Sequence, residues 1–333
     1  MIPFVKTTIG EEEKKAVNKV IDSGWVVMGQ KTVDFEKKFA EYVGSKYAVF
    51  LDSGTNSLFL ALKYFGTGNK FYVPSFTFTA TAEAVVNTGN ELVFIDVDRE
   101  TMCFEGYKSM SIPVHLGGRK SSTEAIIYDS AHRIEKGDIK ADDMALWCYS
   151  FYATKNMSTI QGGAIATNNK NAYEWLKKAR DHGLDLSTKE RYEGKYKQYD
   201  VEFVGYRFKP DDLRAVVGIE QLKKLPENTR RRNCIMRKYN KAFKYNREGN
   251  HLYIILVKNQ VKFINYMLDN EIQCAVNYRP LHTMTAWKNY PKGDMVNTNW
   301  LGKHCVSLPI YPSMTDDEIE KVIITVKKSK QLI

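Results

Sequence analysis

The sequence lacks long apolar runs and has few cysteines. No stretch approaches the roughly 18 to 20 uninterrupted apolar residues of a membrane helix, so we expect no membrane association. Residues 1–15 contain no apolar signal core and turn acidic at residue 11, which favours a cytoplasmic protein. The five cysteines are scattered and form no CxxC pair, which argues against a disulfide framework and a zinc cluster. We therefore expect free thiols and no metal.

Negative charge is in the minority, with 39 acidic against 49 basic residues and a net charge of +10. A basic surface can serve nucleic acid, but it can equally hold nucleotides and phosphates. The densest basic runs, at 230–232 and 327–330, lie beside helical periodicity, so we interpret them as solvated helix faces. No helix-turn-helix, RNP or zinc-finger pattern accompanies them. Charge alone therefore does not predict a nucleic-acid-binding protein.

The composition is that of a globular chain, with 43% apolar and 26% charged residues among 333. Short apolar runs alternate with helical patterns over about residues 45–215, which predicts a mostly parallel sheet covered on both faces. The predicted strands are 47–51, 71–74, 91–97, 124–129, 145–151 and 162–168. The predicted helices are 11–23, 32–43, 58–65, 77–88 and 170–182.

The pattern changes near the middle of the chain. Residues 183–210 fit neither period and predict an excursion or a hairpin. Residues 211–246 are predicted to be largely helical. A small α+β unit follows, with strands at 251–257 and 272–278 and helices at 258–270 and 315–328. We expect a large domain at 1–215 and a small domain at 216–333.

Two turns after predicted strands carry groups suited to ligand binding. Ser53–Asn56 places a glycine at a helix start, where free N–H groups can bind phosphate, although such turns also merely cap helices. Asp129 ends a predicted strand, where parallel sheets place their ligands, and a helix-capping role is equally open.

Two further segments follow strands in the same way. Lys155 lies in a loop with little charge, five residues after Ser150, although a lone lysine is usually a solvated surface group. The run 75–79 contains Phe78, whose ring could stack on a flat cofactor or simply pack in the core. Taken singly, these four signals are weak.

Together and in this order, the segments resemble the DegT/StrS family of sugar aminotransferases, which use pyridoxal 5′-phosphate (PLP). The resemblance runs essentially end to end, and the block SFYATKNMSTIQGGAIATN around Lys155 is its most specific part. It implies an α/β, aspartate-aminotransferase-like (type I) fold. Such a fold has a large domain with a mostly parallel seven-stranded sheet and a small C-terminal α+β domain.

The resemblance also implies a role for each site residue. Lys155 would hold PLP as a Schiff base and, once released, would move a proton, while Asp129 would pair with the pyridine nitrogen. Phe78 would stack on the ring and His132 would lie beside its hydroxyl edge. The phosphate would be bound by Gly54, Thr55, Asn56 and Ser150.

One segment departs from the family pattern. Relatives carry GYNYRM or GYKYNL, whose asparagine reaches the PLP phosphate of the partner subunit, whereas this chain has GYRFKP at 205–210. Arg207 or Lys209 could bind that phosphate by charge, or the two could meet a substrate diphosphate instead. Either way, we expect a homodimer whose subunits share the active site.

The acceptor is the least defined part of the prediction. The resemblance implies transfer of an amine from L-glutamate to a nucleotide-linked keto sugar. The stretch HGLDLSTKERY resembles the branch acting at C4, so we predict an NDP-4-keto-6-deoxyhexose, with His182 and His282 on the substrate side or simply at the surface. A 3-keto sugar or a keto-cyclitol, a non-catalytic PLP-binding protein and a nucleic-acid binder remain open alternatives.

Overall fold

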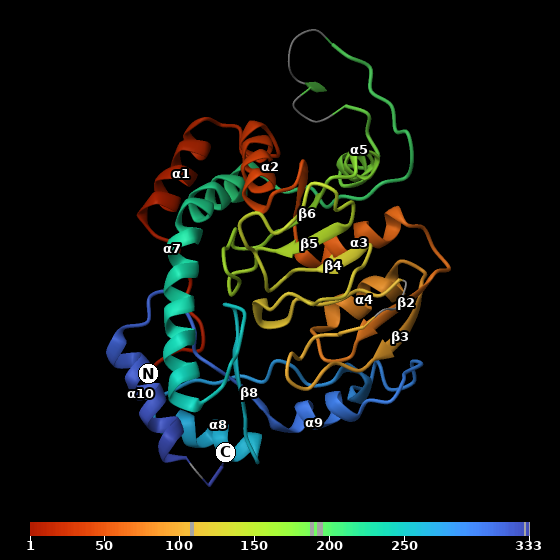
Figure 1. Cartoon of the computed structure of the whole chain (residues 1–333). Helices are drawn as coiled ribbons and strands as arrows, with labels where there is room; N and C mark the ends of the chain where they lie inside the picture. Colours follow the sequence, from red (N-terminus) through yellow and green to blue (C-terminus); the bar gives the residue numbers. More distant parts are fainter. Residues whose placement is uncertain (107–109, 187–189, 192–195, 330, 333) are drawn as a thin grey trace.

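The structure is a computed structural model that describes the chain except residues 107–109, 187–189, 192–195, 330 and 333 (Figure 1). Its helices are α1 (Glu11–Asp22), α2 (Gln30–Val43), α3 (Gly54–Tyr64), α4 (Thr79–Asn87), α5 (Lys170–Ala179), α7 (Asp212–Phe243), α8 (Gln260–Asp269), α9 (Val296–His304) and α10 (Asp316–Lys328). Its strands are β1 (Tyr47–Leu51), β2 (Lys70–Pro74), β3 (Glu91–Ile95), β4 (Ile127–Asp129), β5 (Leu146–Ser150), β6 (Gly163–Thr167), β7 (Tyr253–Leu256) and β8 (Cys305–Leu308).

The main sheet has the strand order β1-β6-β5-β4, and β2 pairs with β3 in a separate ladder. Segment 110–115 lies between the two, because Ser111 bridges to Tyr72 of β2 and Val114 bridges to Asp129 of β4, both in parallel. Strand β6 is antiparallel to both β1 and β5. Strands β1 to β5 therefore share one direction, as a mostly parallel sheet requires, while the count of seven strands stays a prediction.

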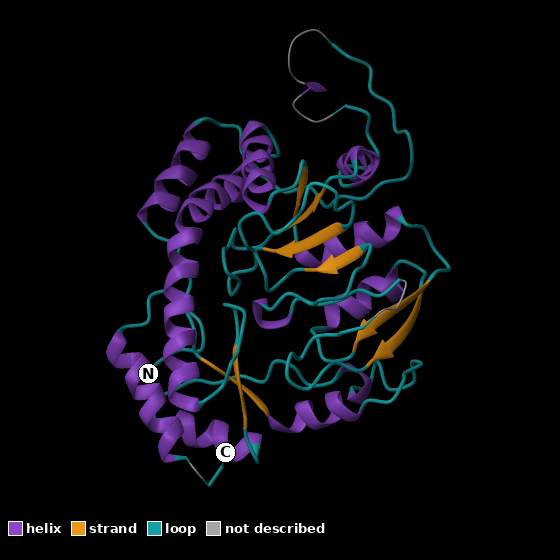
Figure 2. Cartoon of the chain, in the orientation of Figure 1, coloured by secondary structure: helices purple, strands orange, loops and turns teal. Residues whose placement is uncertain are grey.

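Both faces of the main sheet are covered, which explains why its strands are apolar throughout (Figure 2). Alternate residues of β1 enter different cores: Val49 packs with Leu58 and Leu62 of α3. Phe50 points the other way, into a cluster with Phe35 of α2. This layering holds the carboxyl ends of β4 and β5 in fixed positions.

The C-terminal part is built around the antiparallel pair β7–β8, with α8, α10 and the second half of α7 packed on it. The expected strand at 272–278 is reduced to isolated bridges at Ile272 and Ala275. Helix α9 and strand β8 were not predicted. The expected domain boundary after residue 215 falls inside α7 and stays a prediction.

The described residues 183–186 leave the body of the protein and residues 196–205 return to it, as Figure 1 shows in green. The described bases of this excursion pair antiparallel, with bridges Asp181–Arg207 and Leu184–Val201. Gly183 has a φ of +77°, and a Cβ there would lie 1.8 Å from the carbonyl oxygen of Phe203, so only glycine fits. The predicted hairpin is thus present at its base.

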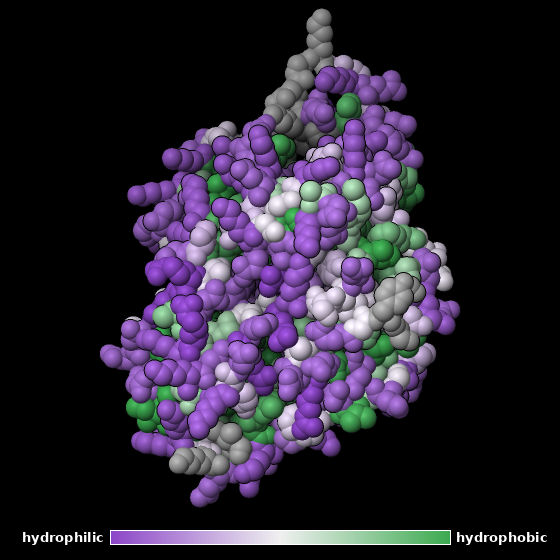
Figure 3. Space-filling model, in the orientation of Figure 1, coloured by the Kyte–Doolittle hydropathy of each residue, from purple (hydrophilic) through white to green (hydrophobic). Residues whose placement is uncertain are grey.

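The surface in Figure 3 is mostly hydrophilic, with small scattered apolar areas. Among the described residues, no helix is long and apolar enough to cross a membrane. The same residues contain no group of three or more His, Cys, Asp or Glu side chains that could hold a metal ion. All five cysteines are free thiols.

Candidate active site

The candidate site lies where β4 and β5 end. Asp129 is the last residue of β4, Ser150 is the last residue of β5, and Lys155 follows in the next loop. A cavity of about 200 Å³ opens at Lys155. Its wall is formed by Phe4, Val5, Thr154, Lys155, Arg232, His251, Asn277, Tyr278 and Ile310.

Lys155 and Asp129 form the electrostatic centre of the site. Burial lowers the pKa of Lys155 to about 8, and the Asp129 charge opposes this shift. Burial raises the pKa of Asp129, while Thr81 and the nearby Lys155 charge act in the other direction. The Asp129 carboxylate accepts bonds from Thr81 Oγ1 at 2.7 Å and the Ala131 N–H at 3.0 Å. A lysine so placed is readily deprotonated, as a nucleophilic amine must be.

His132 lies against this centre as a neutral ring. Burial lowers its pKa well below the usual value, and the positive charge of Lys155 adds to the effect. Its Nδ1 accepts the Gly117 N–H at 3.3 Å, which leaves the proton on Nε2, 3.0 Å from Tyr278 Oη. His132 is thereby held in one tautomer with its hydrogen-bonding edge toward Tyr278.

A chain of amide and imidazole groups fixes the loop after Lys155. Asn156 Oδ1 contacts His251 Nδ1 at 3.0 Å, and Asn156 Nδ2 donates to Asn250 Oδ1 at 2.8 Å. Asn250 in turn donates to Glu135 Oε1 at 2.6 Å. Because Asn156 Oδ1 only accepts, the proton of neutral His251 sits on Nδ1. All four residues of this chain are buried or half-buried, so their hydrogen bonds hold the loop that carries Lys155 in place.

The turn Ser53–Asn56 forms the start of α3. Ser53 Oγ accepts the Asn56 N–H at 3.1 Å, and the Asn56 side chain donates to Asp52 at 2.7 Å. The N–H groups of Gly54 and Thr55 are at the first helical positions, where no intrahelical acceptor exists. A Cβ on Gly54 would lie 2.7 Å from Ser150 Cβ, so the turn rests directly on Ser150.

These groups fit PLP. The helix start with Ser150 offers donors for a phosphate, Asp129 offers a buried carboxylate for a ring N–H, and Lys155 offers an amine that is more readily deprotonated than an ordinary lysine. Phe78, just before α4, is 57% exposed with its ring 5.9 Å from that of Tyr278, so it is free to stack on a further ring. The structure thus brings together Lys155, Asp129, His132 and Phe78.

Four other predicted residues lie elsewhere. His182 is exposed with a φ of +63°, and His282 is buried, with its ring nitrogens at Ser75 Oγ (2.7 Å) and Asn299 Oδ1 (3.0 Å). Arg207 is exposed, and Lys209 forms an ion pair with buried Asp181 at 2.9 Å. None of the four is part of the cavity wall described above. Their roles stay predictions.

The structure adds site residues that sequence reasoning missed, above all Arg232, His251 and Tyr278. We expected the run 230–232 to be one solvated helix face, and this is wrong for Arg232. Successive residues of a helix are rotated by about 100°, so the three side chains point in different directions. The side chain of Arg230 is 76% exposed. Arg232 as a whole is only 4% exposed and lines the cavity. The signal for this inward turn was the apolar spacing on either side of the run.

Comparison with known proteins decides the identity of this arrangement. The sequence profile described as the "DegT/DnrJ/EryC1/StrS aminotransferase family" matches residues 7–327. The chain belongs to this family. Its fold class, its aminotransferase activity and PLP as its cofactor, all expected from the resemblance, are thereby confirmed.

Relatives of this DegT-family chain match it along almost their whole length. The Methanocaldococcus jannaschii protein MJ1066 is 34% identical, over 98% of this chain and 97% of its own. The spore coat polysaccharide biosynthesis protein SpsC of Bacillus subtilis is 31% identical, over 98% and 96%. The fold matches that of a putative sugar aminotransferase, Spr1654 from Streptococcus pneumoniae in its PMP form, with a TM-score of 0.89, 23% identity and 99% of both chains covered.

Proposed function

We propose that this protein is a PLP-dependent aminotransferase that moves the amino group of L-glutamate to C4 of a nucleotide-linked 4-keto-6-deoxyhexose. The observation that carries the catalytic part is the buried pair of Lys155 and Asp129. A lysine with a pKa near 8 faces a cavity, with a buried carboxylate close enough to oppose that shift. A merely solvated lysine would have neither property.

Lys155 provides the amine that first holds the cofactor covalently and then moves a proton at the substrate carbon. At neutral pH its pKa of about 8 leaves an appreciable fraction unprotonated, in contrast to an ordinary lysine near 10.4. Bound PLP supplies a ring that withdraws electrons from that carbon when its nitrogen is protonated. Asp129 keeps the nitrogen protonated by accepting its hydrogen bond.

The remaining residues orient and bind. Gly54, Thr55 and Ser150 bind the phosphate, and Asn56 holds the turn through Asp52. His132, whose Nε2 lies 3.0 Å from Tyr278 Oη, would lie beside the cofactor's hydroxyl edge. Phe78, exposed in the single chain, covers one face of the ring.

A homodimer completes the site in this proposal. Arg207, exposed beside the turn, reaches the partner's phosphate or the substrate diphosphate by charge. Lys209 is tied to Asp181 within its own chain and acts in this way only by leaving that ion pair. The backbone of the intervening Phe208 accepts the Asp52 N–H at 3.0 Å, which keeps this segment next to the phosphate turn.

A sugar acceptor is supported by the relatives: SpsC functions in polysaccharide biosynthesis. The nucleotide and the C4 position rest on the resemblance of residues 182–192, which lie partly outside the described residues. His182 and His282 remain the proposed substrate-side histidines. We also place the enzyme in the cytoplasm, where nucleotide sugars would be its substrates.

The test is an absorption experiment on the purified protein with PLP. Added L-glutamate is expected to remove the visible band of the bound cofactor, which shows the first half of the transfer. Nucleotide-keto sugars are then added one at a time, and the correct acceptor restores the band. Restoration by a 3-keto sugar or a keto-cyclitol, but not by a 4-keto sugar, would overturn the acceptor. A protein that binds PLP without responding to glutamate would overturn the reaction.

A further inference from the structure

His251 is a buried ring that uses one of its two nitrogens. Its Nδ1 lies 3.0 Å from Asn156 Oδ1, and none of the described residues forms a hydrogen bond with its Nε2. The ring lines the cavity of about 200 Å³ that Lys155 also lines. Burial, helped by the positive charges of Lys155 and Arg232, lowers the pKa of His251 well below its usual value, so the ring is neutral. Nε2 is therefore the ring nitrogen left for a ligand in this cavity.

The carboxylate of Glu135 determines which nitrogen of His251 carries the proton. A carboxylate only accepts, so Asn250 turns its Nδ2 to Glu135 Oε1 at 2.6 Å and its Oδ1 the other way. Asn156 donates from Nδ2 to that Oδ1 at 2.8 Å, which leaves its own Oδ1 facing His251. The proton of His251 therefore sits on Nδ1, and Nε2 carries a lone pair. Every donor in this chain points toward Glu135.

The neighbouring His132 is used in the opposite way. The centroids of the two rings are 4.4 Å apart. His132 Nδ1 accepts the Gly117 N–H at 3.3 Å, and its Nε2 lies 3.0 Å from Tyr278 Oη, so both nitrogens have partners within the protein. His132 is also not part of the cavity wall described above. Of these two rings, His251 is the one that offers an acceptor to a ligand.

The proposed reaction brings two ligands to this cavity in turn, and they differ in what they can donate. The amine of L-glutamate is the group that reacts, and its two carboxylates only accept hydrogen bonds. A keto sugar carries hydroxyl groups, which can donate to a lone pair. In a 4-keto-6-deoxyhexose, C3 beside the keto carbon carries a hydroxyl, whereas C5 carries the ring oxygen and a methyl group. The C3 hydroxyl is thus the donor nearest to the reacting carbon.

We propose that His251 Nε2 accepts a hydrogen bond from the sugar hydroxyl next to the keto carbon, and that Glu135 positions this acceptor through Asn250 and Asn156. His251 then determines specificity for the sugar and not for the amino donor. This rests on the proposed aminotransferase function and assigns a contact by which its second substrate is recognised.

The first test compares wild type with two variants of His251 in the complete reaction. His251→Phe keeps a ring but has no acceptor, so the KM for the nucleotide-4-keto-6-deoxyhexose should increase about tenfold. His251→Gln can place an amide oxygen near the position of Nε2, so its KM should increase less than about threefold. Titration of the visible band with L-glutamate should stay within about twofold in both variants. His304→Phe, at the end of α9 and outside the cavity wall, is the control and should match wild type.

The second test removes the hydroxyl from the sugar and leaves the protein intact. In wild type, the KM for the 3-deoxy analogue should be about tenfold higher than for the parent sugar. His251→Phe should show the same KM for both, because the contact is already lost. The 2-deoxy analogue is the control, and any change it causes should be equal in the two proteins. Equal KM for the parent and the 3-deoxy analogue in wild type would overturn the proposal, even if no variant folds.

A third measurement needs neither cofactor nor turnover. NMR of the PLP-free protein labelled with 15N-histidine should show His251, identified by its missing signals in His251→Gln, with a proton on Nδ1 and none on Nε2. Glu135→Gln should give both tautomers and raise the KM for the sugar about threefold, because an amide can also donate to Asn250. A proton on Nε2 in wild type would overturn the proposal.

These measurements also separate two kinds of failure. A wild type that has the expected tautomer but does not respond to L-glutamate contradicts the proposed reaction. A wild type that transfers the amine with a sugar KM that His251→Phe leaves unchanged contradicts the contact proposed here. A loss in His251→Phe that is equally large for glutamate and for the sugar contradicts it as well, since the residue would then support the site as a whole.

Discussion

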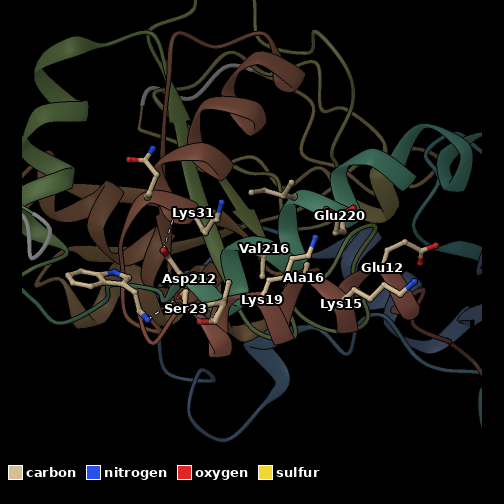
Figure 4. A pocket seen from close by; sticks show the side chains of 13 residues that line it. Glu12, Lys15, Ala16, Lys19, Ser23, Lys31, Asp212, Val216 and Glu220 are labelled. Carbon is tan, nitrogen blue, oxygen red and sulfur yellow. Dashed lines mark hydrogen bonds between the residues drawn. The ribbon is translucent and has the colours of Figure 1, made fainter.

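The cavity beside Lys155 encloses about 200 Å³, whereas a cavity between α1, the start of α2 and the first half of α7 encloses about 670 Å³. The larger one is lined by apolar groups such as Ala16 and Val216, and Lys15, Lys19 and Lys31 stand around it (Figure 4). The smaller one contains a lysine, an arginine and a histidine whose pKa values are all lowered by burial. Perturbed pKa values gather at functional sites, so we assign the chemistry to the smaller cavity although the other is larger.

One buried aspartate lies near each cavity, and the two carboxylates differ in how many hydrogen bonds they accept. Asp212 accepts from the N–H groups of Gly29, Lys31 and Thr32 and from Thr32 Oγ1, at 2.8 to 3.1 Å. Within the described part of the chain, Asp129 accepts from two donors, Thr81 Oγ1 and the Ala131 N–H. The first carboxylate is saturated and joins α7 to α2. The Asp129 carboxylate can still accept a hydrogen bond from a ligand, and its burial raises its pKa.

The largest expected effect is at Lys155. Lys155→Ala should lower the rate of transfer by about 10³-fold or more, because both the covalent anchor and the proton carrier are lost. Lys31→Ala, which removes a lysine from the larger cavity, is the control and should leave the rate within about twofold. Steady-state kinetics with glutamate and the identified acceptor measures both. Comparable losses in the two variants would break the distinction between the cavities.

The two aspartates should separate activity from stability. Asp129→Asn should reduce the rate on the order of 10²-fold. Its unfolding free energy should change by less than about 1 kcal/mol, since a poorly solvated charge is removed. Asp212→Asn should cost about 2–3 kcal/mol of stability, because an amide cannot accept all four bonds. Urea unfolding and kcat, measured on the same preparations, should show a loss of rate in Asp129→Asn and a loss of stability in Asp212→Asn. Equal losses of both quantities in the two variants would contradict this.

The pKa of Lys155 determines how the reactivity of its amine depends on pH. Since the folded pKa is lowered to about 8, the free amine increases about tenfold per pH unit up to pH 8 and then levels off. In the PLP-free protein, the rate of Lys155 acylation by a small amine-selective reagent, followed by peptide mass spectrometry, should trace this curve. Asp129→Asn removes the charge that opposes the shift, so its midpoint should move lower. A wild-type midpoint near 10.4 would refute the buried environment.

The smallest effect is expected in the larger cavity. Ala16→Leu places a bulkier apolar side chain in its wall without touching the network around Asp212. Both kcat and KM should stay within about twofold of wild type. If activity falls more than tenfold while the melting temperature is unchanged, the larger cavity serves the substrate or the subunit contact.

The sequence revealed those site residues that follow the ends of apolar strands. Lys155, Asp129 and the Ser53–Asn56 turn could be found because sheet order places them at one edge. For Arg232 the apolar spacing around it indicates only an inward-facing side chain, and His251 carries no such signal. That both line the cavity follows from the packing of α7 and of the chain before β7, which the sequence does not show. Likewise, α9 and β8 carry too short and too mixed a pattern to predict. His182 and His282 show the converse, because a histidine in a suggestive segment does not reveal where its ring points.

Helix α7 is a single element of 32 residues that contributes Asp212 to one cavity and Arg232 to the other. The two are about 30 Å apart along the helix, and both must face inward. Inserting or deleting one residue between them would turn Arg232 by about 100°, out to solvent, even if every side chain were kept. The stretch therefore fixes the distance between the two cavities, and its length can change only by whole helical turns if both side chains are to keep facing inward.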